Sequence, residues 1–277
     1  MNDTTSTLPP IHPARYLVPN AVTGASMLFG LISLSNSAAG NYALAGWMII
    51  YAVLCDRIDG LVARALRATS ALGMQLDSFA DFLNFGVAPA ALAYSYLSRR
   101  PDLPYQSGGI AWWLLVAVCS IWVLSAVFRL ARYNITADDA LPTKIFFGIP
   151  TTLADGLFAL CFLALLKYEP SYPTFGGPKV FGDLHTPVAA WRYLPVFLAI
   201  GAFLMVSSLP MPKGGKSASK VVTVLVMASM VFGYTSGFSR QVPEISVLFP
   251  LVWTVAFLIW GQVSASARSL KPPPWFS

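Results

Sequence analysis

The feature of this sequence that most limits its fold is a succession of apolar runs, each about as long as a membrane is thick. A hydrocarbon core of about 30 Å needs about 20 apolar residues in a helix, and the backbone polar groups must pair within that helix. Hydrophobic residues make up 56% of the chain and charged residues 11%, which excludes an ordinary soluble domain. The sequence therefore predicts an all-α, polytopic transmembrane helical bundle. Its eight candidate spans are 19–38, 41–62, 76–97, 110–133, 147–166, 191–209, 220–237 and 246–265.

These spans predict a simple organisation: a flexible N-terminal segment (1–15), one transmembrane catalytic domain (16–266) and a short C-terminal tail (267–277). Because only residues 39–41 separate the first two spans, we expect them to form an antiparallel hairpin. No cleavable signal peptide is expected, since the first 18 residues lack a basic flank followed by an apolar run. The connection 168–190 is rich in Pro, Gly and aromatic residues and predicts a structured or re-entrant loop.

The basic residues predict the orientation of the chain in the membrane. Eight spans place both termini on one side, and with that side in the cytoplasm it receives twelve of the eighteen Lys and Arg residues. Cytoplasmic loops carry such an excess, and a net charge of +6 also favours contact with anionic lipids. No basic patch interleaved with aromatic residues predicts nucleic-acid binding. Cys55, Cys119 and Cys161 are unclustered, which predicts neither a disulfide framework nor a zinc site.

Four carboxylates stand close together in this apolar chain. They are Asp56, Asp59, Asp77 and Asp81, four of only twelve acidic residues. The spacings i, i+3 and i, i+4 place each pair on one helix face. An acid within or near the bilayer is expensive and indicates a functional site. Two such faces brought together would repel each other unless cations lie between them, and Mg²⁺ and Mn²⁺ are the ions that prefer oxygen ligands. Salt bridges to Arg57, Arg64 and Arg67 are the structural alternative.

Written with its small residues, the segment is Asp56-x2-Asp59-Gly60-x2-Ala63-Arg64-x8-Gly73-x3-Asp77-x3-Asp81. It resembles the signature of the CDP-alcohol phosphotransferase family, with no departure at any of its eight fixed positions. Within that family, the flanking segments are similar to the membrane-integral phosphatidylserine synthases: VPNAVT (18–23), LDSFADFLNFGVAPA (76–90), RLARYN (129–134), FFGIP (146–150) and LMVSSLPMPK (204–213). The resemblance covers residues 16–215, and Thr152 stands where this subgroup is expected to have a second proline.

The resemblance implies transfer of a phosphatidyl group from CDP-diacylglycerol to L-serine, with release of CMP, at the cytoplasmic face of a bacterial or archaeal membrane. It implies two Mg²⁺ or Mn²⁺ ions held by Asp56, Asp59 and Asp77. Asp81 either completes the metal shell or takes the proton of the attacking hydroxyl. The implied partners are CDP-diacylglycerol, L-serine, membrane lipids and a second copy of the chain in a homodimer. Two alternatives stay open: another acceptor (glycerol 3-phosphate, inositol phosphate or choline), and a divalent-cation transporter.

The resemblance also implies a set of substrate contacts, each with a structural alternative. The small residues and Asn20 and Thr23 would approach the nucleotide, or else serve helix packing and capping. The basic residues would bind phosphate or the serine carboxylate, or else anchor the helices at the membrane surface. Ser78 and Asn84 would orient the acids, while Asp155 would bind the serine ammonium, pair with a basic residue or face a water-filled cavity. The contact residues are Asn20, Thr23, Gly60, Ala63, Arg64, Gly73, Ser78, Arg129, Arg132 and Lys144.

Overall fold

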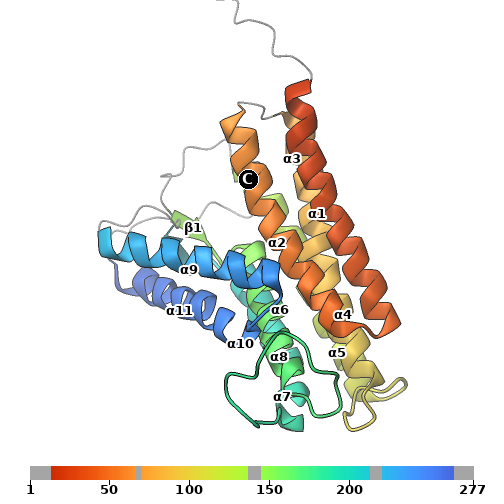
Figure 1. Ribbon diagram of the computed structural model, residues 1–277. Helices are drawn as coiled ribbons and strands as arrows, with labels where there is room; N and C mark the ends of the chain where they lie inside the picture. The colour runs from red at the N-terminus through yellow and green to blue at the C-terminus, as the bar shows by residue number, and fades with distance from the viewer. Residues whose placement is uncertain (1–13, 67–69, 137–144, 213–219, 265–277) are drawn as a thin grey trace, which may run out of the picture.

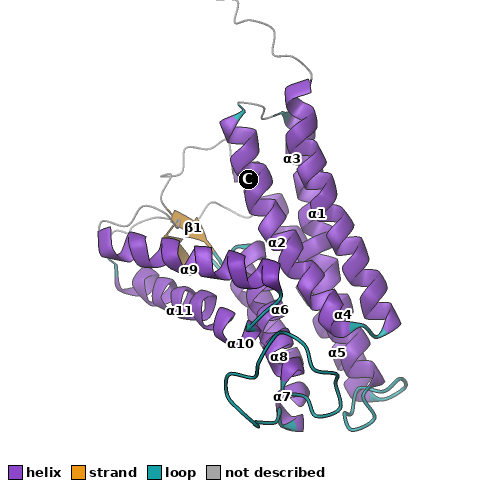
Figure 2. Cartoon of the chain, in the orientation of Figure 1, coloured by secondary structure: helices purple, strands orange, loops and turns teal. Residues whose placement is uncertain are grey.

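The computed structural model describes residues 14–66, 70–136, 145–212 and 220–264, and these are mainly helical (Figures 1 and 2). The predicted tail 267–277 and most of the predicted flexible segment 1–15 lie outside the described residues. The helices are α1 (Ala14–Ala39), α2 (Tyr42–Ala65), α3 (Ala71–Asp81), the π-helix η1 (Phe82–Val87), α4 (Ala88–Arg99), α5 (Ile110–Thr136), α6 (Thr151–Lys167), α7 (Val188–Arg192), α8 (Leu194–Val206), α9 (Lys220–Ser239), α10 (Pro243–Ser246) and α11 (Leu248–Val263).

The all-α class is confirmed, and each predicted span contains helix. Among the described residues, three segments are long and apolar enough to cross a membrane: Leu17–Ala39, Ile110–Asn134 and Pro243–Val263. Two further apolar helices are shorter, at Leu194–Val206 and Thr223–Ser239. The chain is thus built as an integral membrane protein, while the number of eight spans stays a prediction. One ribbon was not predicted: β1 (Ile145–Phe147) pairs antiparallel with β2 (Pro210–Pro212).

Helices α1 and α2 form the expected antiparallel hairpin. Gly40 makes the turn with a φ of +85°, a conformation that favours glycine. The buried face of α1 is a heptad stripe of small residues: Thr23, Ser26, Gly30, Ser33 and Ser37. Large apolar side chains on its other face, such as Leu28 and Leu31, are exposed. This arrangement suits a membrane, where small residues let helix backbones approach each other and apolar residues face lipid.

Helices α3, η1 and α4 form one continuous helix that corresponds to the predicted span 76–97 (Figure 1). Within η1 the backbone widens, because the N–H of Ala88 bonds to the carbonyl of Leu83, five residues back. Pro89 has no N–H to offer to the carbonyl of Phe85, four residues earlier. The indole N–H of Trp122 on α5 donates to that carbonyl instead, at 3.0 Å. The buried carbonyl is thereby satisfied, as buried backbone groups generally are.

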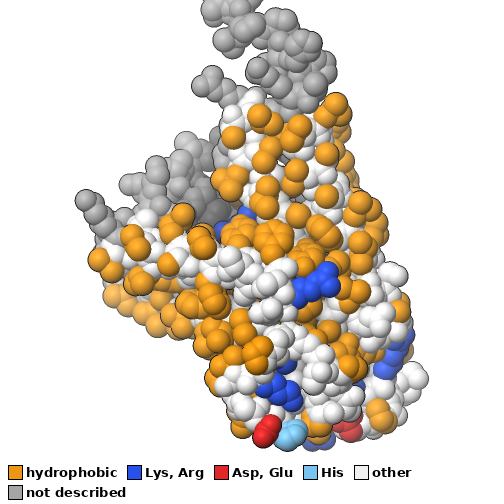
Figure 3. Space-filling view, viewed as in Figure 1, with side chains coloured by type: hydrophobic (Ala, Val, Ile, Leu, Met, Phe, Trp, Pro, Cys, Tyr) orange, Lys and Arg blue, Asp and Glu red, His pale blue; other side chains and the backbone are white. Residues whose placement is uncertain are grey.

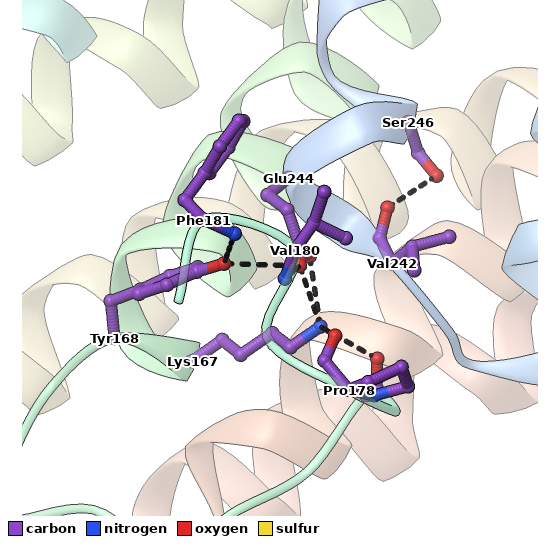
Figure 4. Close-up of polar contacts among 9 residues, drawn as sticks. Lys167, Tyr168, Pro178, Val180, Phe181, Val242, Glu244 and Ser246 are labelled. Carbon is purple, nitrogen blue, oxygen red and sulfur yellow. Dashed lines mark hydrogen bonds and ion pairs between the residues drawn. The ribbon is translucent and has the colours of Figure 1, made fainter. Parts of the chain in front are cut away.

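Buried polar contacts stabilise the end of the bundle where α6 ends and the loop to α7 begins (Figure 4). Nζ of Lys167, the last residue of α6, lies 2.7 Å from a carboxylate oxygen of Glu244 on α10 and donates to the carbonyls of Gly176 and Pro178. The Tyr168 hydroxyl accepts the N–H of Phe181 and donates to Glu244. These contacts fix the loop between α6 and α7 to α10, in agreement with the expectation of a structured loop.

Figure 3 shows a molecular surface dominated by hydrophobic side chains. On the face shown, most charged side chains gather at the end that carries α7 and the loop preceding it, some Lys or Arg side chains lie farther along the bundle, and the rest of the face is hydrophobic or uncharged. This distribution is typical of a protein surrounded by lipid, where charge is confined to the regions facing water.

Candidate active site

The four predicted acids converge from two helices. Asp56 and Asp59 lie near the end of α2, and Asp77 and Asp81 lie in the second half of α3. Asp56, Asp59 and Asp77 each offer a carboxylate oxygen, and these oxygens all lie within 4.8 Å of one another. The carboxyl groups of Asp56 and Asp81 are in hydrogen-bonding contact. Packing of α1 against both α2 and α3 brings the two helices together.

Among the described side chains, Arg57 lies close enough to Asp56 for their charges to interact, but it is not in ion-pair contact with any of these acids. The ion pairs found there join Arg100 to Asp102 and Glu169, and Lys167 to Glu244, all far along the chain from the acids. Arg57 forms no such pair, so the salt-bridge alternative is not found for it. The side chains of Arg64 and Arg67 lie outside the described part of the structure.

Two polar residues of α1 lie near this site, Thr23 against an acid and Asn20 against the start of α3. Oγ1 of Thr23 donates to Oδ2 of Asp59 at 3.0 Å, and it is in the middle of a helix, so it is not a helix cap. Ser70 caps the start of α3, where its Oγ accepts the N–H of Gly73 at 3.0 Å. A Cβ at Gly73 would lie 3.2 Å from Oδ1 of Asn20, so Asn20 sits directly over the first turn of α3.

The end of α2 carries the small residues of the motif. Gly60 and Ala63 are partly buried on its last two turns, beyond Asp59. The backbone of Arg64 belongs to the same helix, while its side chain is outside what the structure describes. Lys144 also lies outside the described residues, so its predicted contact stays a prediction.

The end of α5 lies beside α3. Asn134 donates to Oγ of Ser78 at 2.9 Å, and that hydroxyl donates to the carbonyl of Met74. Ser78 thus links α3 to α5. Arg129 donates from Nε to the carbonyl of Ile149 at 2.5 Å and lies close enough to Asp81 for their charges to interact.

Arg132 is three residues beyond Arg129 on α5, and its side chain is largely buried. Two guanidinium groups on one helix face therefore lie at the end of α5 that reaches the acids. Neither of these side chains is fully exposed to solvent. Guanidinium groups bind phosphate and carboxylate oxygens well, so this end of α5 is suited to a negatively charged ligand.

Asp155 lies in α6 and does not belong to the acid cluster. Its side chain is 0% exposed, and neither carboxylate oxygen has a hydrogen-bond partner among the described residues. The predicted ion pair with a basic residue is therefore not found there.

Tyr234 is one residue that the sequence reasoning missed. It lies on α9, within electrostatic range of Asp56 and Arg57. Close packing brings α9 to α2, because a Cβ at Gly237 would lie 3.1–3.2 Å from Leu54 and Ile50. Since α9 reads as an uninterrupted apolar span, its sequence gives no signal that one tyrosine faces the acids.

Ser26 is the second missed residue, and it bonds to Asn84 on η1 at 2.8 Å. Here the heptad stripe on α1 was a usable signal, because Ser26 follows Thr23 on the same helix face. The sequence reasoning also missed Gly148, the glycine of the FFGIP segment. Gly148 has a φ of +75° and would meet three carbonyl oxygens of α8 and its end if it carried a Cβ.

Comparisons with known proteins agree with this geometry. The family model for CDP-alcohol phosphatidyltransferases matches residues 16–177. A CDP-diacylglycerol–serine O-phosphatidyltransferase of Helicobacter pylori (strain ATCC 700392 / 26695) is 31% identical over 257 residues, which cover 92% of each sequence. The Bacillus subtilis (strain 168) protein of the same name is 30% identical over 73% of this chain and 94% of its own length. A Saccharomyces cerevisiae relative of that name is 32% identical over 52% of the chain. With the motif complete and the acids brought together, the chain belongs to the CDP-alcohol phosphatidyltransferase family.

Proposed function

We propose that this protein transfers the phosphatidyl group of CDP-diacylglycerol to L-serine, producing phosphatidylserine and CMP, at a divalent-metal site on the cytoplasmic face of the membrane. The observation that carries the proposal is the convergence of Asp56, Asp59 and Asp77 oxygens within 4.8 Å. The choice of serine is supported by the printed names of the relatives from Helicobacter pylori and Bacillus subtilis.

The residues present fit divalent ions. Mg²⁺ and Mn²⁺ prefer carboxylate oxygens, and Asp56, Asp59 and Asp77 offer only such ligands. Contact between the Asp56 and Asp81 carboxyl groups adds a fourth acid, so four like charges crowd a partly buried site. Bound ions would neutralise these acids. They would also stabilise the negative charge on the donor diphosphate while the phosphatidyl group is transferred.

The protein's own residues then bind and position the two substrates. Gly60 and Ala63 leave room for cytidine beside α2, and Thr23 holds Asp59 in one orientation. Arg129 and Arg132 bind anionic oxygens, either of the donor diphosphate or of the serine carboxylate. These arginines and the acids lie on different helices, so a substrate that lies between them is bound from both sides.

Asp81 is the residue that we place nearest the chemistry. The serine hydroxyl attacks the phosphorus on the diacylglycerol side of the diphosphate, its proton passes to a carboxylate, and CMP leaves. Asp81 lies one helical turn beyond Asp77 and close to Arg129, which places a proton acceptor beside both an acid and a cation. Its contact with Asp56 equally suits a metal ligand, so its substitution is informative in either role.

CMP release tests this proposal directly. The purified protein would be assayed in detergent with CDP-diacylglycerol, Mg²⁺ or Mn²⁺, and one acceptor at a time: L-serine, glycerol 3-phosphate, inositol, inositol phosphate or choline. We expect release with serine only, abolished by chelation and by Asp81→Asn. Release with a different acceptor would keep the metal site and overturn the choice of serine. No release with any acceptor, together with ion flux through proteoliposomes, would favour a transporter instead.

A further inference from the structure

We propose that Asn84 is a positioning residue: bonded to Ser26 and accommodated by Gly30, it sets the separation of the two acid-bearing helices and so the affinity of the site for divalent ions. This inference rests on the proposed metal site. It concerns a different element, because Asn84 lies on η1 and does not belong to the acid cluster.

The contacts form a continuous path between the two pairs of acids. Nδ2 of Asn84 donates to Oγ of Ser26 at 2.8 Å, and that hydroxyl donates to the carbonyl of Ala52 at 3.2 Å. Asn84 is three residues beyond Asp81, and Ala52 is four residues before Asp56. Each end of the path therefore lies one helical turn from an acid.

Gly30 allows this path to be short. A Cβ built at Gly30 would lie 2.1 Å from Oδ1 of Asn84 and 3.5 Å from its Cα. A larger residue at position 30 would push η1 away from α1. It would displace α3 as well, because η1 continues directly from α3. Asn84 itself is 0% exposed, so its side chain has no space into which it could retreat.

The polarity of Asn84 is difficult to explain by packing alone. Its Oδ1 has no hydrogen-bond partner among the described residues, and burying an unpaired amide oxygen is unfavourable. An apolar side chain of similar size would avoid that cost. An apolar side chain could not make the hydrogen bond from Asn84 to Ser26. That bond fixes η1 against the α1–α2 hairpin.

The π-helix determines where this side chain points. Its wider turn inserts one more residue per turn than an α-helix, immediately after Asp81. Such insertions are frequent at functional sites. Here the insertion directs Asn84 toward α1 while leaving Asp77 and Asp81 on the face toward α2.

The test is Mn²⁺ binding to the purified full-length protein, measured by calorimetry without substrate. We expect Asn84→Ala and Ser26→Ala to weaken Mn²⁺ binding about 10- to 100-fold, the range found when residues that support metal ligands are removed. The matched control is Ser33→Ala, which removes a bond of the same kind, Oγ to the carbonyl of Ala45 at 2.9 Å, from the same stripe but far from the acids. Its Mn²⁺ affinity should equal that of the unchanged protein.

A double variant separates positioning from loss of fold. Gly30→Ala alone should weaken Mn²⁺ binding through the clash with Asn84. Gly30→Ala with Asn84→Ala should bind no worse than Asn84→Ala, because the clash is gone. CMP release by Asn84→Ala should recover at high Mn²⁺ with an unchanged KM for serine.

Three outcomes would overturn the inference. Mn²⁺ affinities of Asn84→Ala and Ser26→Ala equal to that of Ser33→Ala would exclude a positioning role. Additive losses in the Gly30→Ala, Asn84→Ala pair would show that the two residues do not act through their contact. Absence of Mn²⁺ binding by the unchanged protein would instead remove the proposed metal site itself, which distinguishes that failure from the other two.

Discussion

Buried acids in this protein differ in what compensates their charge. Glu244 meets Lys167 at 2.7 Å, and Glu169 meets Arg100 at 3.0 Å. Asp59 accepts hydrogen bonds from the Thr23 hydroxyl and the Gly60 backbone and lies beside other acids, with no cation paired to it by any of these contacts. Asp155 has no partner among the described residues. Because an uncompensated acid in a membrane protein is costly, Asp59 and Asp155 are the positions where function, and not stability, best explains the residue.

Asp77→Asn should abolish turnover while leaving the fold intact. The amide keeps the volume of the side chain but removes a charged ligand, and we expect CMP release to fall more than about 100-fold, beyond the 10- to 100-fold loss typical of supporting residues. The control is Asp102→Asn, an acid paired with Arg100 on a connecting loop. Retention of full activity by Asp77→Asn would contradict the metal-site assignment.

Asp155→Ala should raise the thermal stability of the protein. Removing a buried carboxylate that has no partner among the described residues relieves a desolvation penalty, and we expect a gain of about 1–3 kcal/mol. Thermal unfolding in detergent measures the gain, with Ala154→Gly as a neighbouring change that leaves the acid in place. If stability is unchanged and the KM for serine rises instead, Asp155 binds the substrate ammonium.

At the scale of elements, the connection before α6 depends on one glycine. Gly148 has a positive φ, and a Cβ there would lie 2.6 Å from the carbonyl oxygen of Met205 and 2.8 Å from that of Ser207. Its N–H donates to the carbonyl of Leu209. This turn carries Ile149, whose carbonyl receives Arg129, so the glycine also places an arginine of the site.

Gly148→Ala should therefore lower the free energy of unfolding by about 3 kcal/mol or more, since strain and overlap add. Gly108→Ala is the matched control: Gly108 also has a positive φ, of +98°, but no atom lies within 4 Å of its Cβ position. Strain alone there should cost about 1–2 kcal/mol. Equal losses in the two variants would show that the contact with α8 contributes nothing.

The pair Lys167 and Glu244 joins three elements, namely α6, α10 and the loop before α7. Lys167→Met should lower the free energy of unfolding by about 3–5 kcal/mol, because it leaves a buried carboxylate unpaired. Adding Glu244→Met should restore part of that loss, and susceptibility of the loop to protease should follow the same order. A double variant less stable than Lys167→Met would refute a simple ion pair.

Helices were predictable because their apolar runs are long, while the contacts between distant segments were not. The predicted range 110–133 falls within α5, the range 41–62 begins one residue before α2, and the motif identified all four acids that converge. The β1–β2 ribbon depends on pairing between Phe146 and Met211, far apart in sequence. The approach of Tyr234 to Asp56 likewise depends on how α9 packs, which its uniform hydrophobicity does not encode.

Across the whole molecule, the buried ion pairs and the cluster of acids lie toward opposite ends. One end carries the paired charges of Arg100, Glu169 and Lys167. The end of α2 and the start of α3 lie at the other end of the bundle (Figure 1), and the acids lie within the last three turns of α2 and the second half of α3. This polarity agrees with the basic-residue bias of the sequence, which predicts that the second end faces the cytoplasm, where the nucleotide of the donor lipid is available.

Cysteine labelling tests that orientation. In a parent variant in which Cys55, Cys119 and Cys161 are replaced by Ala, Ser107→Cys places an exposed thiol on the loop before α5, and Leu66→Cys places one just beyond α2. A membrane-impermeant maleimide should label Ser107→Cys in intact spheroplasts and Leu66→Cys only after lysis, provided both variants retain serine-dependent CMP release. Because the acids lie on the same side as Leu66, the reverse pattern would place the active site away from the cytoplasm. A cytoplasmic nucleotide donor could not then reach it, and the proposed reaction would have to be abandoned even with the metal site intact.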